Sequence, residues 1–81
     1  MERQRIAAYI TPTKYVKVTK ADADLPDGPC RALYIGTAGT LNFMEVDGTI
    51  RTDFPAKEGY LVGAFRQVRT GGDADDIWAV Y

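Results

Sequence analysis

From residue 30 onward, apolar and polar side chains alternate in short runs, as they do in strands that bury one face. Glycine, proline and aspartate gather between the runs, where they favour turns. No apolar spacing typical of a helix persists over three turns. The alternating runs are "CRALYI" (30–35), "TLNFMEV" (40–46), "YLVGAFRQVR" (60–69) and "IWAVY" (77–81), after a weaker "KYVKV" (14–18).

These runs, with a further strand after the turn at 47–48, amount to about six short strands with turns roughly every ten residues. We therefore expect an all-β fold, a small single-domain antiparallel β-sandwich or barrel. Pro12 ends any helix before it, because proline pushes the preceding residue out of the helical region. The chain thus divides into an N-terminal arm, residues 1–12, and a single β domain, residues 13–81.

One hairpin can be predicted residue by residue. Asp47-Gly48 is a strong hairpin signal, and a two-residue turn there pairs Glu45 with Ile50, Phe43 with Thr52 and Leu41 with Phe54. The apolar residues of both strands then share one face of the sheet: Leu41, Phe43, Ile50 and Phe54. The other face carries Asn42, Met44, Thr49, Arg51 and Asp53.

The neighbouring runs give three further local predictions. In "CRALYI", strict alternation places Arg31, Leu33 and Ile35 on one face and Cys30, Ala32 and Tyr34 on the other. Cys30 is expected to be a small buried apolar residue, because no activating base or helix end is visible beside it. Gly63, inside the run 60–69, indicates a bulge or a bend.

Composition excludes several function classes. Ten basic and eleven acidic residues give a net charge of −1, so no affinity for nucleic acid or for a membrane surface is expected. The chain has no histidine and one cysteine, which argues against an enzyme, a metal site or a cofactor. "GTAGT" (36–40) lacks the Lys-Ser/Thr pair of a phosphate-binding loop, and the aspartates of "DADLPDG" (22–28) do not have calcium-loop spacing.

A chain of 81 residues buries a thin core, and one cysteine allows no internal disulfide. Association with copies of itself or with a partner is therefore expected. The arginines near the ends of the predicted strands have two interpretations, as solvated strand ends or as ion-pair partners of the acidic loops of a neighbouring copy. Aromatic residues at strand ends fit core or subunit contacts. The candidate interface residues are Arg51, Arg66, Arg69, Tyr60 and Trp78.

The order of these turns and strands resembles a family of very short phage and prophage virion proteins, the spike base proteins of gene transfer agents. The shared pattern is an aspartate-rich loop, an Arg-Ala-Leu-Tyr strand, a Gly-x-x-Gly turn, an Asp-Gly hairpin and a Thr-Gly loop before the last strand. Gln67 and Gly72 depart from it. The matching residues are Arg31 to Tyr34, Gly36, Gly39, Asp47, Gly48, Gly59, Val68, Thr70, Gly71, Ala74, Asp76, Ile77 and Tyr81.

The resemblance implies a structural role. A head spike base subunit is made in the bacterial cytoplasm and assembles with itself, as a pentamer, on the five-fold vertices of the capsid. Its partners are the major capsid protein and a spike fibre protein that contacts the host, and it lies at the surface of a phage-like particle. A ring of this kind requires two different matching surfaces on each copy.

One alternative comes from the residues themselves. A small carbohydrate- or ligand-binding β-module would line a groove with exposed aromatic side chains. The candidates for such a groove are Tyr9, Tyr15, Tyr60, Trp78 and Tyr81. This alternative requires that Trp78 is not fully buried.

Overall fold

The computed structural model describes residues 14–81, which form a single antiparallel sheet of six strands. The part of the chain it describes contains no helix, so the predicted all-β class is confirmed. The predicted arm, residues 1–12, and Tyr9 lie outside the described residues. The strands are β1 (Tyr15–Lys17), β2 (Cys30–Thr37), β3 (Gly39–Glu45), β4 (Ile50–Ala56), β5 (Gly59–Val68) and β6 (Asp75–Val80).

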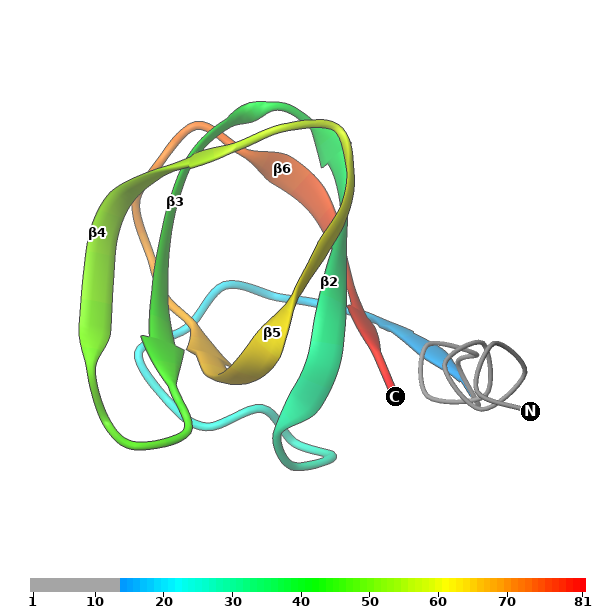
Figure 1. Ribbon diagram of the computed structural model, residues 1–81, viewed down its shortest axis with the longest axis vertical. Helices are drawn as coiled ribbons and strands as arrows, with labels where there is room; N and C mark the ends of the chain where they lie inside the picture. The colour runs from blue at the N-terminus through cyan, green and yellow to red at the C-terminus, as the bar shows by residue number, and fades with distance from the viewer. Residues whose placement is uncertain (1–13) are drawn as a thin grey trace, which may run out of the picture.

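The sheet has the strand order β1-β6-β2-β5-β3-β4 and curls around a central core (Figure 1). The strands belong to one sheet rather than to two stacked sheets, and within residues 14–81 its edge strands β1 and β4 do not pair. The curl depends on β5, which pairs with β2 through its first part and with β3 through its last residues. The register with β2 shifts between Cys30 and Ala32, opposite Gly63 and Ala64. The bulge predicted at Gly63 is therefore confirmed.

The core lies on the inner, concave face of the sheet. Its largest fully buried side chains come from β2, β3 and the end of β5, namely Leu33, Ile35, Leu41 and Val68. Ile77 and Ala79 of β6 complete this layer, and Leu25 of the loop before β2 closes one end of it. A single apolar layer enclosed by a curled sheet is the arrangement that a chain of this length can fill.

The β3–β4 hairpin differs from its prediction near the turn. Gly48 adopts a φ of 93° and the Glu45 amide donates to the Thr49 carbonyl oxygen at 2.8 Å, so the loop has three residues. Met44 therefore faces Ile50, one place from the predicted register, and Ile50 is 47% exposed. The prediction that Ile50 shares a face with Phe43 is therefore wrong, and so is the predicted place of Arg51 on the opposite face, because Arg51 is the partner of Phe43. A bulge at Asp53, where φ is 55°, restores the predicted pair of Leu41 with Phe54.

Strand β2 also departs from strict alternation at its first residues. Leu33 and Ile35 are fully buried as predicted, and Cys30 is buried in the same core. Arg31 is exposed, so its predicted place beside Leu33 is wrong, and the predicted place of Cys30 on the face of Ala32 and Tyr34 is wrong as well. The shift of register opposite Gly63 explains this, because it breaks the two-residue period between Cys30 and Ala32.

The two glycine-containing motifs of the sequence lie against each other. A Cβ atom at Gly39, the first residue of β3, would lie 2.5 Å from the Ala74 amide nitrogen. The Ala74 amide donates to the Thr40 carbonyl oxygen at 2.9 Å, and the Asp73 amide donates to the Thr40 hydroxyl at 3.1 Å. Only glycine permits this approach, so the Gly-x-x-Gly turn fixes the loop that leads into β6.

Candidate functional site

The outer face of the sheet carries four aromatic residues from four different strands, which we call the outer aromatic cluster: Tyr15, Tyr34, Tyr60 and Trp78. Tyr34 of β2 pairs with Trp78 of β6 on one side and with Tyr60 of β5 on the other. Trp78 in turn pairs with Lys17 of β1. One row across four strands therefore reads Lys17, Trp78, Tyr34 and Tyr60, and cross-strand neighbours of this kind pack side by side.

A second row beside it forms the floor of the cluster. The register gives the order Tyr15, Val80, Ala32 and Val62. Val80 and Ala32 are 2% and 7% exposed, although they do not belong to the core cluster. The hydroxyl groups of Tyr15 and Tyr60, from strands separated by β6 and β2, share a hydrogen bond. We infer that these two side chains span the floor between their strands and shield it from water.

The rings of the cluster surround a shallow depression of about 450 Å³. The Tyr34 and Tyr60 rings meet edge to face, with centroids 5.1 Å apart, and the Tyr15 and Tyr60 centroids are 6.4 Å apart. The hydrogen bond shared with Tyr60 is the main cause of the raised pKa of the Tyr15 hydroxyl, since the bond favours the neutral form of Tyr15. All four side chains that line the depression are aromatic.

A charged pair borders the depression beside Trp78. The Lys17 ammonium lies 5.1 Å from the centroid of the Trp78 ring and forms an ion pair with Asp76. The Trp78 indole Nε1 donates to the same carboxylate at 3.3 Å. These interactions, that of Lys17 foremost, lower the pKa of Asp76. Gly36 leaves space for the Asp76 side chain, because a Cβ atom at position 36 would collide with it.

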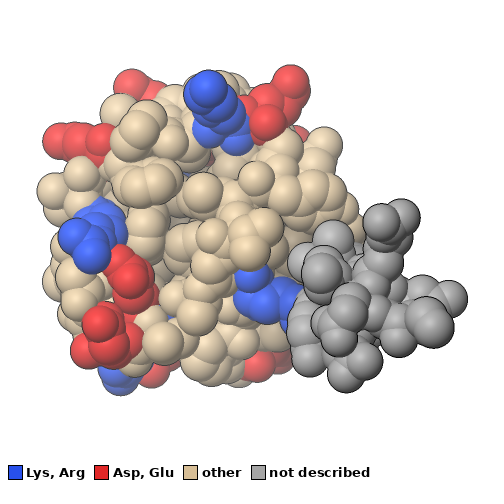
Figure 2. Space-filling view, viewed as in Figure 1, with Lys and Arg blue, Asp and Glu red and all other residues tan. Residues whose placement is uncertain are grey.

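The structure separates the candidate interface arginines from the two aromatic candidates. Arg51 donates to Glu45 across the β3–β4 hairpin at 2.5 Å. Arg66 donates to Asp24 at 3.0 Å and Arg69 to the Gln67 side-chain oxygen at 2.5 Å. Each of these arginines therefore contacts its own chain. Figure 2 shows the same mixture at the surface, where acidic and basic side chains often lie side by side at the rim of the view.

The aspartate-rich loop is tied to the end of β5. Asp22 accepts hydrogen bonds from the Thr70 amide and hydroxyl at 3.1 and 3.0 Å, which lowers the pKa of its carboxyl group. Asp24 accepts from the Gln67 side-chain amide at 2.8 Å, and this bond, together with Arg66, lowers its pKa. These carboxylates hold the loop against the end of β5, so their role in the described structure is to stabilise the position of this loop.

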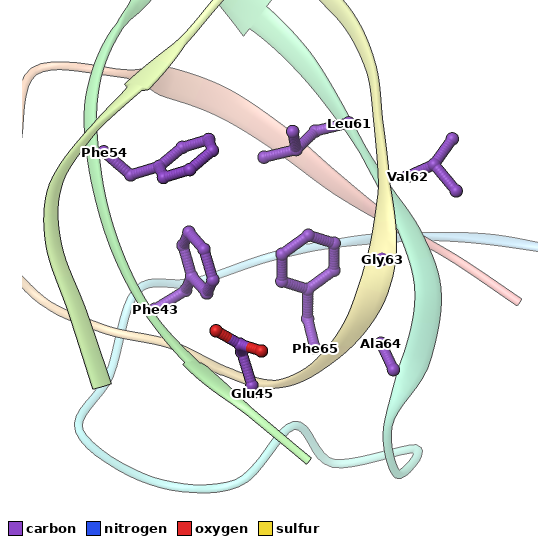
Figure 3. Close-up of a pocket in the computed structure, with 8 residues that line it drawn as sticks. All are labelled: Phe43, Glu45, Phe54, Leu61, Val62, Gly63, Ala64 and Phe65. Atoms are coloured by element: carbon purple, nitrogen blue, oxygen red, sulfur yellow. The ribbon is translucent and has the colours of Figure 1, made fainter. Parts of the chain in front are cut away.

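A second, smaller pocket opens on the inner side of the sheet. It has a volume of about 150 Å³ and lies between the β3–β4 hairpin and the first half of β5. Figure 3 shows Phe43, Phe54, Phe65 and Leu61 pointing toward one another, while Val62 points away. The three phenylalanine rings meet edge to face, with centroids 4.9 and 5.3 Å apart. This pocket continues the core and offers one carboxylate, Glu45, at its side.

Sequence reasoning found part of the outer site. Tyr60 and Trp78 were predicted as interface residues and Tyr15 as part of a groove, and the structure brings all three together. Trp78 is half-buried, so the requirement of the ligand-binding alternative is met. Tyr81 lies elsewhere, with its hydroxyl donating to the Gly28 carbonyl oxygen at 2.9 Å. Tyr34, Lys17 and Asp76 were missed, because only the strand order places them beside Trp78.

Comparisons with known proteins add no relative: no family model, no curated protein and no solved structure matches the chain.

Proposed function

We propose that this chain is a structural subunit of a phage-like virion, a head spike base protein that assembles with itself on a capsid vertex and carries a fibre. The observation that supports this proposal best is the contact between the motifs that carry the resemblance. The Gly-x-x-Gly turn and the loop before β6 are far apart in the sequence, yet they require each other through Gly39 and Ala74. The residues that carry the resemblance to the spike base family are therefore residues that specify the fold.

The surface of the hairpin is suited to contact between subunits. Val46 and Ile50 are each 47% exposed at the end of the β3–β4 hairpin, and on β5 the side chain of Val62 is 72% exposed. Large apolar side chains at two separate places are what a head-to-tail ring requires. Strand β4 is an edge, but its bulge at Asp53 and its Pro55 hinder the addition of another strand. We therefore place the contact in side chains rather than in strand pairing.

The proposal is tested by native mass spectrometry of the chain alone and with the major capsid protein and spike fibre protein. We expect a discrete ring, with each copy burying about 800 Å² or more against its neighbours. Ile50→Lys should shift the mass toward the monomer while circular dichroism stays unchanged. Glu58→Lys, an exposed position in the β4–β5 turn, is the matched control and should leave the mass unaltered.

A chain that remains monomeric at all concentrations, and that binds neither capsid protein nor fibre, would exclude this function. Electron microscopy of particles provides the second readout. Density for the chain at the capsid vertices is expected, and its absence from purified particles that carry fibres would exclude the proposal equally well.

A further inference from the structure

The outer aromatic cluster has the composition of a site for an organic cation. Ring faces attract positive charge through their quadrupole, and cages of several aromatic side chains bind quaternary ammonium groups in this way. Here three tyrosines and one tryptophan line one depression, and the carboxylate of Asp76 lies beside the tryptophan. The four rings come from four strands of one sheet, so their positions are set by the backbone register.

The chain itself shows which sign of charge the cluster favours. The ammonium group of Lys17 lies over the Trp78 ring and pairs with Asp76. A cation is therefore already held at the edge of the depression by one ring face and one carboxylate. Three further rings, those of Tyr15, Tyr34 and Tyr60, line the remaining space.

We propose that this depression is an aromatic cage that binds a trimethylammonium group, as in choline and its phosphate ester. A metal ion does not suit the walls, because Ca²⁺ and Mg²⁺ require several oxygen ligands, and among residues 14–81 the four side chains that line the depression are all aromatic, with the Asp76 carboxylate bonded to Trp78 at its border. A primary ammonium group would bring three N–H donors, which ring faces satisfy poorly. A quaternary ammonium group has no N–H donor, so apolar rings suit it.

The cage is held in place before any ligand binds. Three of the four rings are restricted by contacts with one another. The Tyr15 and Tyr60 hydroxyl groups share a hydrogen bond, and the Tyr34 ring packs edge to face against the Tyr60 ring. The bond from Trp78 Nε1 to Asp76 restricts the fourth. Side chains that are already ordered lose little conformational entropy on binding. This inference does not depend on the proposed role in a virion.

The experiment uses the intrinsic fluorescence of Trp78, the only tryptophan of the chain. Choline and tetramethylammonium should change its emission in a saturable way. The control ligand is 3,3-dimethylbutan-1-ol, which has the shape of choline without its charge, and it should bind at least about tenfold more weakly. Equal binding of the neutral alcohol, or no response to choline up to about 100 mM, would overturn the proposal.

Three variants, each checked for folding by circular dichroism, locate the site. Tyr34→Ala should weaken choline binding about tenfold, whereas Val46→Ala, on the distant hairpin, should not change it. Lys17→Met keeps the aliphatic stem but removes the tethered cation that competes for Trp78, so it should strengthen binding several-fold. Unchanged or weaker binding by Lys17→Met would contradict the cage. Because this variant changes an exposed side chain whose ion pair lies at the surface, the test stands even if Tyr34→Ala does not fold.

Two comparisons separate the cage from other uses of the same face. Choline and phosphocholine are titrated in parallel, and the ligand that binds more tightly identifies the free cation or its phosphate ester as the source.

A change of emission with neutral hexose oligosaccharides or a proline-rich peptide, but not with choline, would overturn the proposal. So would a loss of the native oligomer in Tyr34→Ala without any choline response, because the cluster would then be a subunit contact. Conversely, choline binding by a monomer that ignores capsid and fibre would refute only the virion role.

Discussion

The two faces of this sheet each carry an aromatic cluster, and the clusters differ in chemistry. Inside, Phe43 packs edge to face against both Phe54 and Phe65 around the small inner pocket. Outside, three tyrosines and Trp78 surround an open depression and bond to one another and to Asp76. Phenylalanine offers only apolar area, whereas tyrosine and tryptophan add a polar group. The inner cluster therefore holds the fold, and the outer one presents a surface.

The largest expected effect breaks the inner cluster. Phe43 is 4% exposed and contacts both other phenylalanines, so Phe43→Ala should lower the free energy of unfolding by about 3–5 kcal/mol. Tyr34→Ala, the matched change on the outer face, should cost about 1 kcal/mol, the contribution of one exposed ring contact. Urea unfolding measures both. Similar losses for the two variants would contradict the division of roles.

The next effect should damage both clusters together. Gly39→Ala places a methyl group against the backbone of Ala74, which precedes β6. Since β6 carries Ile77 inward and Trp78 outward, its displacement disturbs both faces. We expect a loss of about 1–3 kcal/mol and a change in Trp78 emission. Ala38→Gly, which alters the same turn without adding an atom, should leave the emission unchanged; if Gly39→Ala is also neutral, the contact is not required.

A smaller effect is expected when the hydrogen bond between the Tyr15 and Tyr60 hydroxyl groups is removed. Tyr60→Phe removes the hydroxyl that bonds to Tyr15 but keeps the ring. We expect a loss of about 0.5–1 kcal/mol in the free energy of unfolding, with choline binding retained because the ring face remains. Val80 and Ala32 should become more accessible beneath the loosened pair, as faster exchange of their amide hydrogens would reveal. A loss of choline binding in this variant would mean that the hydroxyl, and not the ring, carries the recognition.

The smallest effect distinguishes the faces by pH. The pKa of Asp76 is lowered in the folded chain, so its ionised form stabilises the fold above its unfolded pKa of about 3.9. This contribution disappears as the pH falls through the lower folded pKa. Asp76→Asn, which asparagine's tolerance of the φ of 52° permits, should lower the Tm at pH 7 and match the unmodified chain in strong acid.

Phe43→Leu serves as the pH-independent reference from the inner cluster. Its Tm difference from the unmodified chain should stay constant over the same pH range, because the substitution removes no charge and no hydrogen bond of a titratable group. If the Asp76→Asn difference also stayed constant into strong acid, the ion pair with Lys17 would not contribute to folding.

Much of the strand pattern could be predicted, because period-two alternation and turn residues are local properties. The presence of the β3–β4 hairpin, its pair of Leu41 with Phe54, the burial of Cys30 and the bulge at Gly63 were correct, whereas the hairpin register next to the turn was wrong. Ile50 and Arg31 were wrong for one reason. Arg31 lies at the register shift between Cys30 and Ala32, and Ile50 follows a turn that is one residue longer than predicted. Either change of one residue moves a side chain to the other face.

The outer site could be predicted only in part, since its members are neighbours through the strand order. β6 inserts between β1 and β2, which brings Trp78 beside Tyr34 and Lys17. The residue patterns of "KYVKV" and "IWAVY" do not predict where β6 lies in the strand order. The aromatic residues were visible in the sequence, but the arrangement that makes them a cage depends on pairing between segments far apart in the chain.

The pairing of β1 with β6 also has a consequence for the order of folding. It joins the first and last strands of the described chain, and closing so long a loop has a high entropic cost until the strands between are in place. The β3–β4 hairpin can form early from neighbouring residues, whereas the four rings converge only when β6 docks. During synthesis the outer cluster would therefore be completed last, and its Trp78 emission would be a natural reporter of the final folding step.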